Sequence, residues 1–434
     1  MAKSTITRRQ FLKCAAGTSA AMVGSAYLVP ASALGKAGSV APSNRITMGC
    51  IGVGGRGTGV MRGFLGRDDV HVVAVCDVDQ KQRDKAKKLV DDKYGNGDCK
   101  AYLDFREVIA REDINALSLA MPDHWHSIPA IMGAQTGKDI YAEKPLARTI
   151  YEGRAMVNAV QRYNVVWQTG SQQRSSENFR RACELVRNGR IGKVYRVEVG
   201  LPTGRPGGTL PVSAVPEGLD WDFWLGPAPW RPYQAFGRNG PHWDWRWIMD
   251  FSGGQLTDWA GHHIDIAHWG LGLERTGPVE IEGKGVCPEN GIYNTLIEYK
   301  FTCKYANGLV MIVANNKQIT QGTKWYGEKG WIYVNRGKLA ADPPDVLKEV
   351  IGSDEVKLYE SRDHQGNFLE CVKTRQETIA PIEVGHRSIS VGLLGEIAML
   401  LGRKLRWDPD KEQFVNDDAA NRMLRRPMRS PWHL

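Results

Sequence analysis

Residues 46–57, ITMGCIGVGGRG, join an apolar segment of strand character to a glycine-rich loop. The loop has the pattern G-x-G-x-x-G, and a helix-forming stretch follows it. A second apolar segment, residues 72–76, ends at Asp77, twenty residues after Gly57. This order of strand, glycine loop, helix, strand and acid is typical of a βαβ unit that binds a dinucleotide. In a chain with 48 glycines, the loop pattern alone is weak evidence for a nucleotide site. Its position between a strand and a helix, with the acid after the next strand, makes the evidence specific.

Each position of the loop has a predicted task. Gly52 permits the tight turn, Gly54 lets the backbone approach a pyrophosphate, and Gly57 lets the helix pack against the strand. Gly55 and Arg56 lie at the start of the helix, where unpaired backbone N–H groups face the phosphates. The alternative is a glycine-rich loop without a ligand.

Asp77 indicates which dinucleotide is bound. An acid at the end of the second strand accepts hydrogen bonds from the adenosine ribose, which favours NAD. NADP stays open, because residues beside Asp77 could accommodate a 2′-phosphate.

The N-terminus reads as a twin-arginine signal peptide over residues 1–33, followed by a linker over residues 34–44. Arg8 and Arg9 precede a run of small apolar residues, and Ala31-Ser32-Ala33 is an A-x-A cleavage site. The run lacks the length and the large aliphatic residues of a stable membrane span. We therefore expect an exported, periplasmic protein with no membrane span after cleavage. The alternative is a basic tail that is never cleaved.

Charge and cysteine content exclude several classes of function. The formal net charge is +9, of which four charges belong to the leader, which has no acids, so +5 is left on the mature chain. No basic stripe stands out, so no nucleic-acid partner is expected. The cysteines left after cleavage show no metal-ligand spacing. We expect no metal site and no disulfide.

The fold class predicted is α/β, with a doubly wound Rossmann domain at residues 45–170. Apolar strands alternate there with helical periodicity, the strands being residues 46–51, 72–76, 114–120, 139–142 and 165–169. Ligands of such sheets gather at the carboxyl ends of the strands. His124, His126, Glu143 and Lys144 follow strands at that edge, and we assign them to the nicotinamide end of the cofactor site.

Residues 171–434 are predicted to form an α+β domain that binds substrate and carries a largely antiparallel open sheet. Its strands are predicted at residues 194–199, 296–300, 309–313 and 331–334, and late helices at 366–374 and 388–401. Residues 202–250 form a Pro/Gly-rich insertion with six of the fourteen tryptophans. Flat rings that stack on a sugar and a satellite core under a long loop are both compatible with this composition.

Residues 253–269 predict the helix that carries chemistry. Asp258, His262 and Asp265 fall at i, i+4 and i+7, which places them on one face. An aspartate one turn from a histidine can orient the ring and stabilise its charged form, which gives a proton-transfer group near neutral pH. The alternatives are a structural helix with a satisfied polar face and, less favoured, a metal site.

The glycine loop, the triplet Glu143-Lys144-Pro145 and the G-G-x-x-x-D-x-x-x-H helix occur in that order. Together they resemble the glucose–fructose oxidoreductase / inositol dehydrogenase / rhizopine-catabolism (Gfo/Idh/MocA) family, from about residue 45 to the end. The resemblance implies action on sugars or cyclitols with NAD or NADP, and an open sheet that supports a homo-oligomer.

The resemblance also implies roles for individual residues. Lys144 would lie beside the nicotinamide and the substrate hydroxyl, His262 would exchange the proton, and Asp258 would fix the substrate or the ring. The chain departs slightly from the family pattern, because its helix glycine, Gly261, is shifted by one position. For His124 and His126, a cofactor contact and a packed structural role are equally compatible.

The substrate contacts expected are His263, Trp243 and Arg246. They come from the helix and from the tryptophan-rich insertion.

The predicted function is an oxidoreductase that transfers hydride between tightly bound NAD and a sugar or cyclitol carbon. Tight binding is expected because free NAD is scarce outside the cytoplasm. One alternative is a redox-neutral glycosidase or lyase that oxidises a ring hydroxyl transiently. The other is a sugar-binding protein without catalysis.

Overall fold

The computed structural model describes residues 40–41, 44–234 and 240–434. The predicted signal peptide and most of the linker lie outside these residues. The chain divides into two units, residues 1–45 and 46–434. In the first unit, Arg45 Nε donates a hydrogen bond to the Val40 carbonyl at 3.1 Å. The second unit holds both sheets and the candidate site.

The first sheet is parallel throughout, with the strand order β3-β2-β1-β4-β5-β6. This is the order of a dinucleotide-binding Rossmann sheet, so the predicted fold class is confirmed. The strands are β1 (Ile46–Ile51), β2 (Val70–Cys76), β3 (Lys100–Tyr102), β4 (Ala116–Leu119), β5 (Asp139–Ala142) and β6 (Trp167–Thr169). The sequence analysis did not predict β3, a short and partly exposed edge strand.

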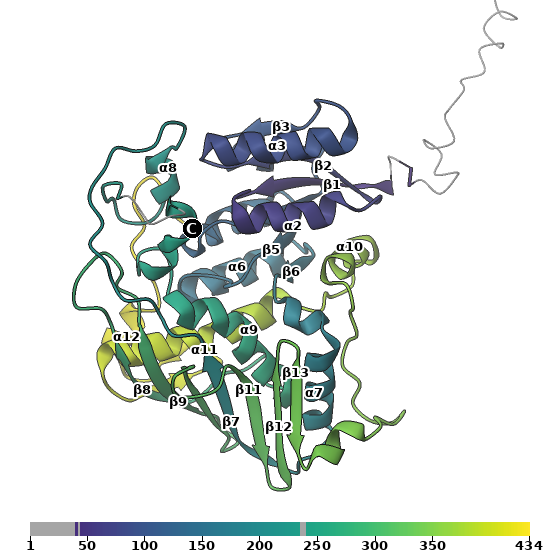
Figure 1. Ribbon diagram of the computed structural model, residues 1–434, viewed down its shortest axis with the longest axis vertical. Helices are drawn as coiled ribbons and strands as arrows, with labels where there is room; N and C mark the ends of the chain where they lie inside the picture. The colour runs from purple at the N-terminus through teal and green to yellow at the C-terminus, as the bar shows by residue number, and fades with distance from the viewer. Residues whose placement is uncertain (1–39, 42–43, 235–239) are drawn as a thin grey trace, which may run out of the picture. The chain divides into compact units, whose positions relative to one another are not determined.

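Helices connect these strands and lie beside the sheet (Figure 1). They are α2 (Gly55–Leu65), α3 (Gln80–Tyr94), α4 (Phe105–Ile109), α5 (Ser127–Gln135) and α6 (Ile150–Arg162). Asp79 caps α3 by accepting a hydrogen bond from the Lys81 N–H. Helix α2 begins at Gly55, so the second half of the glycine loop belongs to the helix.

The second sheet has nine strands in the order β13-β12-β11-β7-β10-β9-β8-β14-β15. Every pair is antiparallel except β7 with β10, so the sheet is largely antiparallel, as predicted. The strands are β7 (Val194–Leu201), β8 (Glu280–Val286), β9 (Glu298–Lys304), β10 (Val310–Asn315), β11 (Gly322–Gly327), β12 (Gly330–Asn335), β13 (Lys338–Asp342), β14 (Leu405–Asp408) and β15 (Gln413–Phe414).

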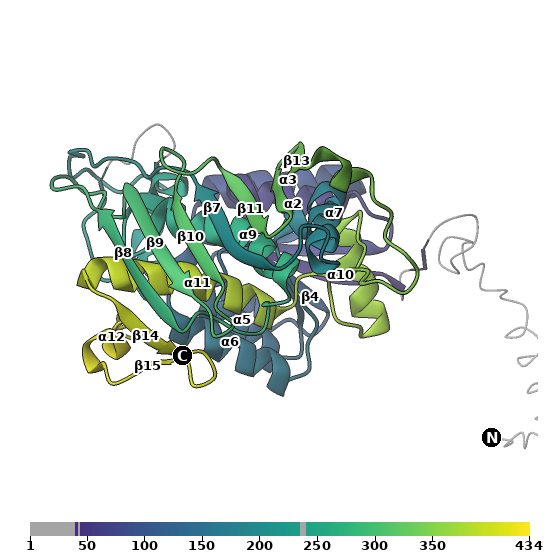
Figure 2. The same cartoon turned by 90° about the horizontal axis from the view of Figure 1, so that it is seen from below.

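Helices cover one face of this second sheet. They are α7 (Glu177–Arg187), α9 (Gly254–Leu271) and α11 (Ile382–Leu401). Figure 2 shows the strands in front and these helices behind them, so the sheet turns its other face to the outside. The homo-oligomer expected on this open face stays a prediction.

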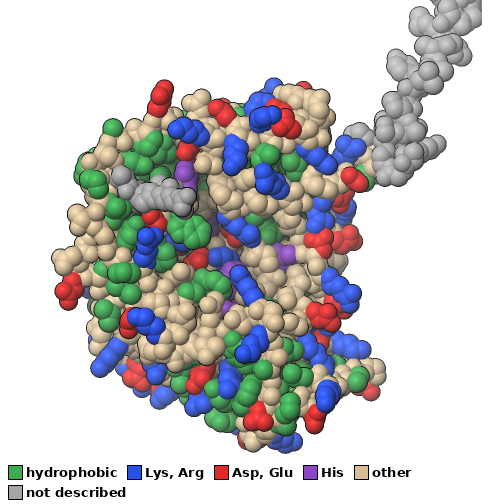
Figure 3. Space-filling model, viewed as in Figure 1, with side chains coloured by type: hydrophobic (Ala, Val, Ile, Leu, Met, Phe, Trp, Pro, Cys, Tyr) green, Lys and Arg blue, Asp and Glu red, His purple; other side chains and the backbone are tan. Residues whose placement is uncertain are grey.

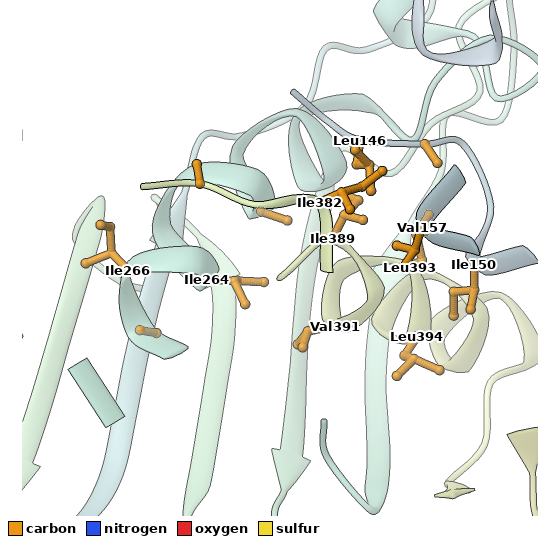
Figure 4. Packing of buried hydrophobic residues seen from close by; sticks show 14 of the residues in the cluster. Leu146, Ile150, Val157, Ile264, Ile266, Ile382, Ile389, Val391, Leu393 and Leu394 are labelled. Atoms are coloured by element: carbon orange, nitrogen blue, oxygen red, sulfur yellow. The ribbon is translucent and has the colours of Figure 1, made fainter. Parts of the chain in front are cut away.

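Helix α11 forms the centre of the packing. It contacts α9, α6 and β8, and Figure 4 shows Ile389 and Leu393 of α11 among apolar side chains of its neighbours. Among the described residues, α11 alone is long and apolar enough to cross a membrane, and 83% of its apolar window is buried inside the protein. Such burial is usual for the internal helix of a folded domain.

Helix α10 (His364–Thr374) returns to the first sheet. Phe368 packs edge-on against Phe64 and Tyr141, and the Gln168 side-chain amide donates to the His364 carbonyl. This part of the second domain therefore completes the core of the first.

A buried ion pair joins the loop after β6 to helix α9. Arg174 Nε lies 2.7 Å from Asp265 Oδ2, its Nη2 lies 2.9 Å from Oδ1, and the two side chains are 3% and 2% exposed. Ser388 of α11 donates a third hydrogen bond to Asp265. Asp265 therefore anchors α9, although the sequence placed it on the same face as Asp258 and His262.

Replacing Asp265 with alanine should lower the free energy of unfolding by about 3–5 kcal/mol, because it leaves a buried guanidinium without its bidentate partner. The double variant Arg174→Met with Asp265→Leu should recover part of the loss, since it removes both charges of the pair and leaves Glu274 with Arg187 at 3.6 Å. Urea unfolding followed by circular dichroism measures both. A cost below about 1 kcal/mol for Asp265→Ala would show that the pair is not structural.

Candidate active site

One cavity of about 980 Å³ contains the predicted cofactor and catalytic positions together. Gly52, Gly54, Gly55, Arg56, Gly57 and Asp77 line one part of it. Glu143, Lys144, Asp258, His262, Trp243 and Arg246 line the rest. Figure 3 shows this face of the molecule hollowed near its middle, with basic and histidine side chains at the hollow.

The glycine loop has the geometry of a dinucleotide cradle. Gly52 has φ +77°, in the left-handed region that favours glycine. A Cβ on Gly57 would lie 1.7 Å from the Gly52 carbonyl oxygen, so only glycine fits there. Gly55 has nothing within 4 Å of its Cβ position, and no side chain caps α2. The N–H groups of this helix start are therefore available to an anion in the cavity, which fits the pyrophosphate of NAD.

Asp77 lies at the end of β2 with its carboxylate already oriented. Its Oδ2 accepts from the Val53 N–H at 2.9 Å and its Oδ1 from the Asp79 N–H at 3.0 Å. Burial raises the pKa of Asp77 above its ordinary value, while these N–H groups oppose that shift. Each oxygen keeps a lone pair for a ribose hydroxyl.

Replacing Gly57 with alanine should lower the affinity for NAD by more than about tenfold, or about 1.4 kcal/mol, because the new Cβ displaces the loop. Gly59→Ala is the matched control one half-turn further along α2, since nothing lies within 4 Å of its Cβ position. Calorimetric titration with NAD, after bound nucleotide has been removed, measures both variants, and circular dichroism checks their folding. Equal NAD affinity in a folded Gly57→Ala would contradict a cofactor site at this loop.

The triplet after β5 holds two of the charged groups in the cavity wall. Glu143 Oε1 lies 2.6 Å from Arg56 Nη2, and Lys144 Nζ lies 2.7 Å from Asp258 Oδ1. The Lys144–Pro145 peptide bond is cis. A Cβ on Gly261 would lie 3.3 Å from the Lys144 Cβ, so the shifted glycine of α9 is the residue that the triplet packs against.

Asp258 interacts with Lys144 and not with His262, contrary to the expectation from the helix pattern. Burial by itself would raise the pKa of Asp258, but Lys144 and Arg246 outweigh it and lower the pKa below its ordinary value. Asp258 is therefore ionised and holds the Lys144 ammonium in place.

His262 is a neutral imidazole in this setting. It is 4% exposed, and its Nδ1 is buried with no hydrogen-bond partner among the residues that the structure describes. Burial lowers the pKa of His262 well below its ordinary value, and the positive charges of Lys144 and Arg336 lower it further. The sequence predicted a stabilised imidazolium, and the structure corrects this: the ring is prepared to accept a proton.

The imidazole of His262 should titrate well below pH 6.5, its ordinary pKa. Since the unfolded chain binds this proton with the ordinary pKa, its uptake favours unfolding, and stability is lost as the pH falls below about 6.5. Nuclear magnetic resonance of the ring proton measures the midpoint, with His262→Asn to assign the signal.

Removal of one neighbouring charge provides the control. In Lys144→Met the His262 midpoint should rise, because one like charge is gone. A wild-type midpoint at or above 6.5 would contradict a lowered pKa.

Three predicted residues lie behind the cavity wall. His126 places its two ring nitrogens 2.8 Å from the Pro145 and Met121 carbonyls, and His124 Nε2 lies 3.2 Å from the Trp224 carbonyl. His263 is fully buried and stacks on Trp259. His126 thus supports the turn that carries Lys144, and the packed alternative fits both His124 and His126 better than direct contact with a cofactor.

The sequence analysis missed Gln172, Gln173 and Arg336, which also line the cavity. The two glutamines follow β6, at the same sheet edge as the predicted residues, and that position was an available signal. Arg336 lies in the turn between β12 and β13, and no sequence pattern pointed to it. No group of three or more possible metal ligands occurs among the described residues, and all seven cysteines described are free thiols.

Residues 46–171 match the NAD-binding Rossmann domain of the Gfo/Idh/MocA oxidoreductase family, and residues 183–434 match the C-terminal α/β domain of the same family. The chain is similar to myo-inositol 2-dehydrogenase of Thermotoga maritima, with 24% identity over 85% of this chain and 97% of the relative. A glycosyl hydrolase family 109 protein of Shewanella pealeana is 25% identical over 83% of this chain and 81% of the relative.

Solved structures share the fold at lower identity. The WlbA dehydrogenase of Bordetella pertussis, solved with NADH and UDP-GlcNAcA, has a TM-score of 0.61 and 19% identity. The match covers 84% of this chain and 99% of that protein.

Proposed function

Because the chain belongs to the Gfo/Idh/MocA family of NAD-binding oxidoreductases, we propose that it transfers hydride between NAD and a carbon of a sugar or cyclitol. The observation that carries the proposal is the convergence of Lys144, Asp258 and His262 on the cavity that the glycine loop also lines. An NAD-binding loop explains the cofactor, and the three side chains explain how a hydroxyl proton moves.

The roles of these side chains follow from their charges. NAD, when bound, supplies hydride acceptance and return. His262 is neutral and takes the proton of the substrate hydroxyl. Lys144 donates a hydrogen bond to the oxygen as negative charge develops on it. Asp258 holds the ammonium 2.7 Å from its own Oδ1 and keeps it oriented.

We also propose that the cofactor stays bound between turnovers. Two described residues of the insertion, Gly218 and His242, contact the turn between β2 and α3 beside Asp77. His242 Nε2 lies 2.8 Å from Asp79 Oδ2, and the Gly218 carbonyl accepts from the Gln80 N–H at 2.8 Å. These hydrogen bonds hold the insertion beside Asp77, where the ribose would bind, and this supports slow release of the nucleotide.

The C-terminal tail binds the middle of the insertion. Arg429 Nε donates to the Gly226 carbonyl at 2.9 Å, and Trp432 stacks on Phe223 with centroids 5.6 Å apart. Retention of the cofactor agrees with the twin-arginine leader predicted for residues 1–33, since we propose an exported enzyme that is loaded with NAD before it leaves the cytoplasm.

A second candidate is a redox-neutral glycosidase. Oxidation of a ring hydroxyl acidifies the neighbouring C–H, elimination then expels the aglycone, and addition of water with return of the hydride yields the free sugar. The glycosyl hydrolase relative and the fastened insertion favour it.

One experiment separates these functions. The purified protein is acid-quenched to identify any released nucleotide, and sugars, cyclitols and aryl glycosides are added to the intact protein. Accumulation of bound reduced nicotinamide, seen by its near-ultraviolet absorbance, supports the dehydrogenase. Release of the aryl alcohol without net reduction supports the glycosidase. Sugar binding with neither change would leave a binding protein and contradict both enzymes.

Lys144→Met should lower the rate constant of nicotinamide reduction by about 10²- to 10⁴-fold, because the developing oxyanion loses its donor. Its nucleotide content should stay near that of the wild type if Lys144 serves the chemical step. Lys81→Met is the control, because Lys81 lies in the exposed first turn of α3. Single-turnover absorbance traces measure the rate, and an unchanged rate in Lys144→Met would refute the assigned role.

A further inference from the structure

The substrate end of the cavity carries more positive than negative charge. Asp258 is the carboxylate at its centre, with Lys144 Nζ 2.7 Å and Arg246 Nε 3.9 Å from its Oδ1. Arg336 is a third cation close enough to lower the pKa of the same carboxyl. One carboxylate thus faces three cations.

Neither of the other acids at this end balances the excess. Glu143 already binds Arg56 at 2.6 Å. Asp123 is 2% exposed and accepts a hydrogen bond from Ser252 Oγ at 2.6 Å. Burial raises the pKa of Asp123 above its ordinary value. Even when Asp123 is counted as charged, Lys144, Arg246 and Arg336 outnumber it and Asp258.

Arg246 is held rigidly at this site. Its guanidinium lies between two rings of the insertion, 4.5 Å from the Trp243 centroid and 4.4 Å from the Trp245 centroid. Two aromatic faces fix its orientation without neutralising its charge.

Arg336 is positioned without an ionic partner. Its guanidinium carbon lies 4.7 Å above the Trp259 ring, and the side-chain oxygen of Gln173, with its amide turned toward the His262 carbonyl, accepts from Nε at 3.3 Å. No carboxylate lies within 4 Å of it in the part of the chain that the structure describes. Stacking and the Nε bond leave both terminal nitrogens of the fork available for a planar anion.

We propose that the substrate is an anionic sugar, and that Arg336 binds its negatively charged group, a carboxylate or a phosphate. The inference rests on the proposed function, since Lys144 and His262 define where the reacting carbon lies. Arg336 is exposed at the cavity, so a neutral sugar leaves its guanidinium to water and gains no ionic contact there. A carboxylate or phosphate on the ring pairs with it and offsets the surplus charge around Asp258.

The test compares acid and neutral sugars of the same ring. Holoprotein is titrated with glucuronate, glucose 6-phosphate and glucose, and with galacturonate and galactose, while tryptophan fluorescence reports binding. At least one anion should bind about 10- to 100-fold more tightly than its neutral counterpart, as expected for a charge-assisted hydrogen bond. The uronates and the phosphate ester distinguish the two sources of charge.

Variants assign the preference to Arg336. Arg336→Gln should reduce the acid-to-neutral ratio to near one, and Arg336→Lys should keep part of it. Lys338→Gln is the matched control, because Lys338 belongs to the same hairpin but lies outside the residues that line the cavity. Circular dichroism and the NAD content of each variant verify that the fold and the cofactor site are intact.

Several outcomes would overturn the proposal. One is a wild type that binds acid and neutral sugars equally, or binds no sugar at all. Another is tighter binding of acid sugars that survives in Arg336→Gln. Loss of NAD from Arg336→Gln with the preference retained would assign Arg336 to the cofactor pyrophosphate instead. Reduction of NAD by neutral sugars in preference to acids would refute this inference and leave the proposed function standing.

Discussion

The ion pair between Lys144 and Asp258 connects the two halves of the site. Lys144 follows β5 of the first sheet, and Asp258 belongs to α9, which packs on the second sheet. Their 2.7 Å separation requires the helix to approach the triplet closely, and Gly261 permits that approach, with its Cβ position only 3.3 Å from the Lys144 Cβ. The Arg174–Asp265 pair anchors the same helix about two turns after Asp258. Without this close approach of α9 to the triplet, the cofactor loop and His262 would lie on separate surfaces.

Burial and charge together decide what each group in the cavity can do. Asp258 remains ionised because two cations outweigh the cost of its burial. His262 remains neutral because burial and the charges of Lys144 and Arg336 act against its protonation. Oxidation of a hydroxyl needs both a proton acceptor and a hydrogen-bond donor to the developing oxyanion. The neutral His262 provides the first, and Lys144, held by Asp258, provides the second.

The insertion contributes to both structure and site. Trp221, Trp224, Trp245 and Trp247 are buried in a satellite core, as one of the two interpretations of the sequence had it. Trp243 is half exposed and lies at the cavity with Arg246. The satellite core gives the segment a rigid base, and from that base it reaches the turn between β2 and α3. The same tryptophans therefore stabilise the segment and shape the wall, which is why composition alone could not separate the two roles.

The sequence by itself determined the Rossmann domain and the glycine loop with Asp77. It also determined that the lysine triplet and the histidine helix follow the loop in that order. These features are local. A glycine is required where a Cβ would meet the backbone, as at Gly57. Strands and helices are recognised from the spacing of apolar residues that are neighbours in the chain. Only the tertiary structure decided that Asp258 serves Lys144, that His124, His126 and His263 lie behind the wall, and that Arg336 enters the cavity from a distant hairpin. Those outcomes depend on distances and burial between segments far apart in the chain, and a pKa depends on all the charges around a group, which no local pattern records.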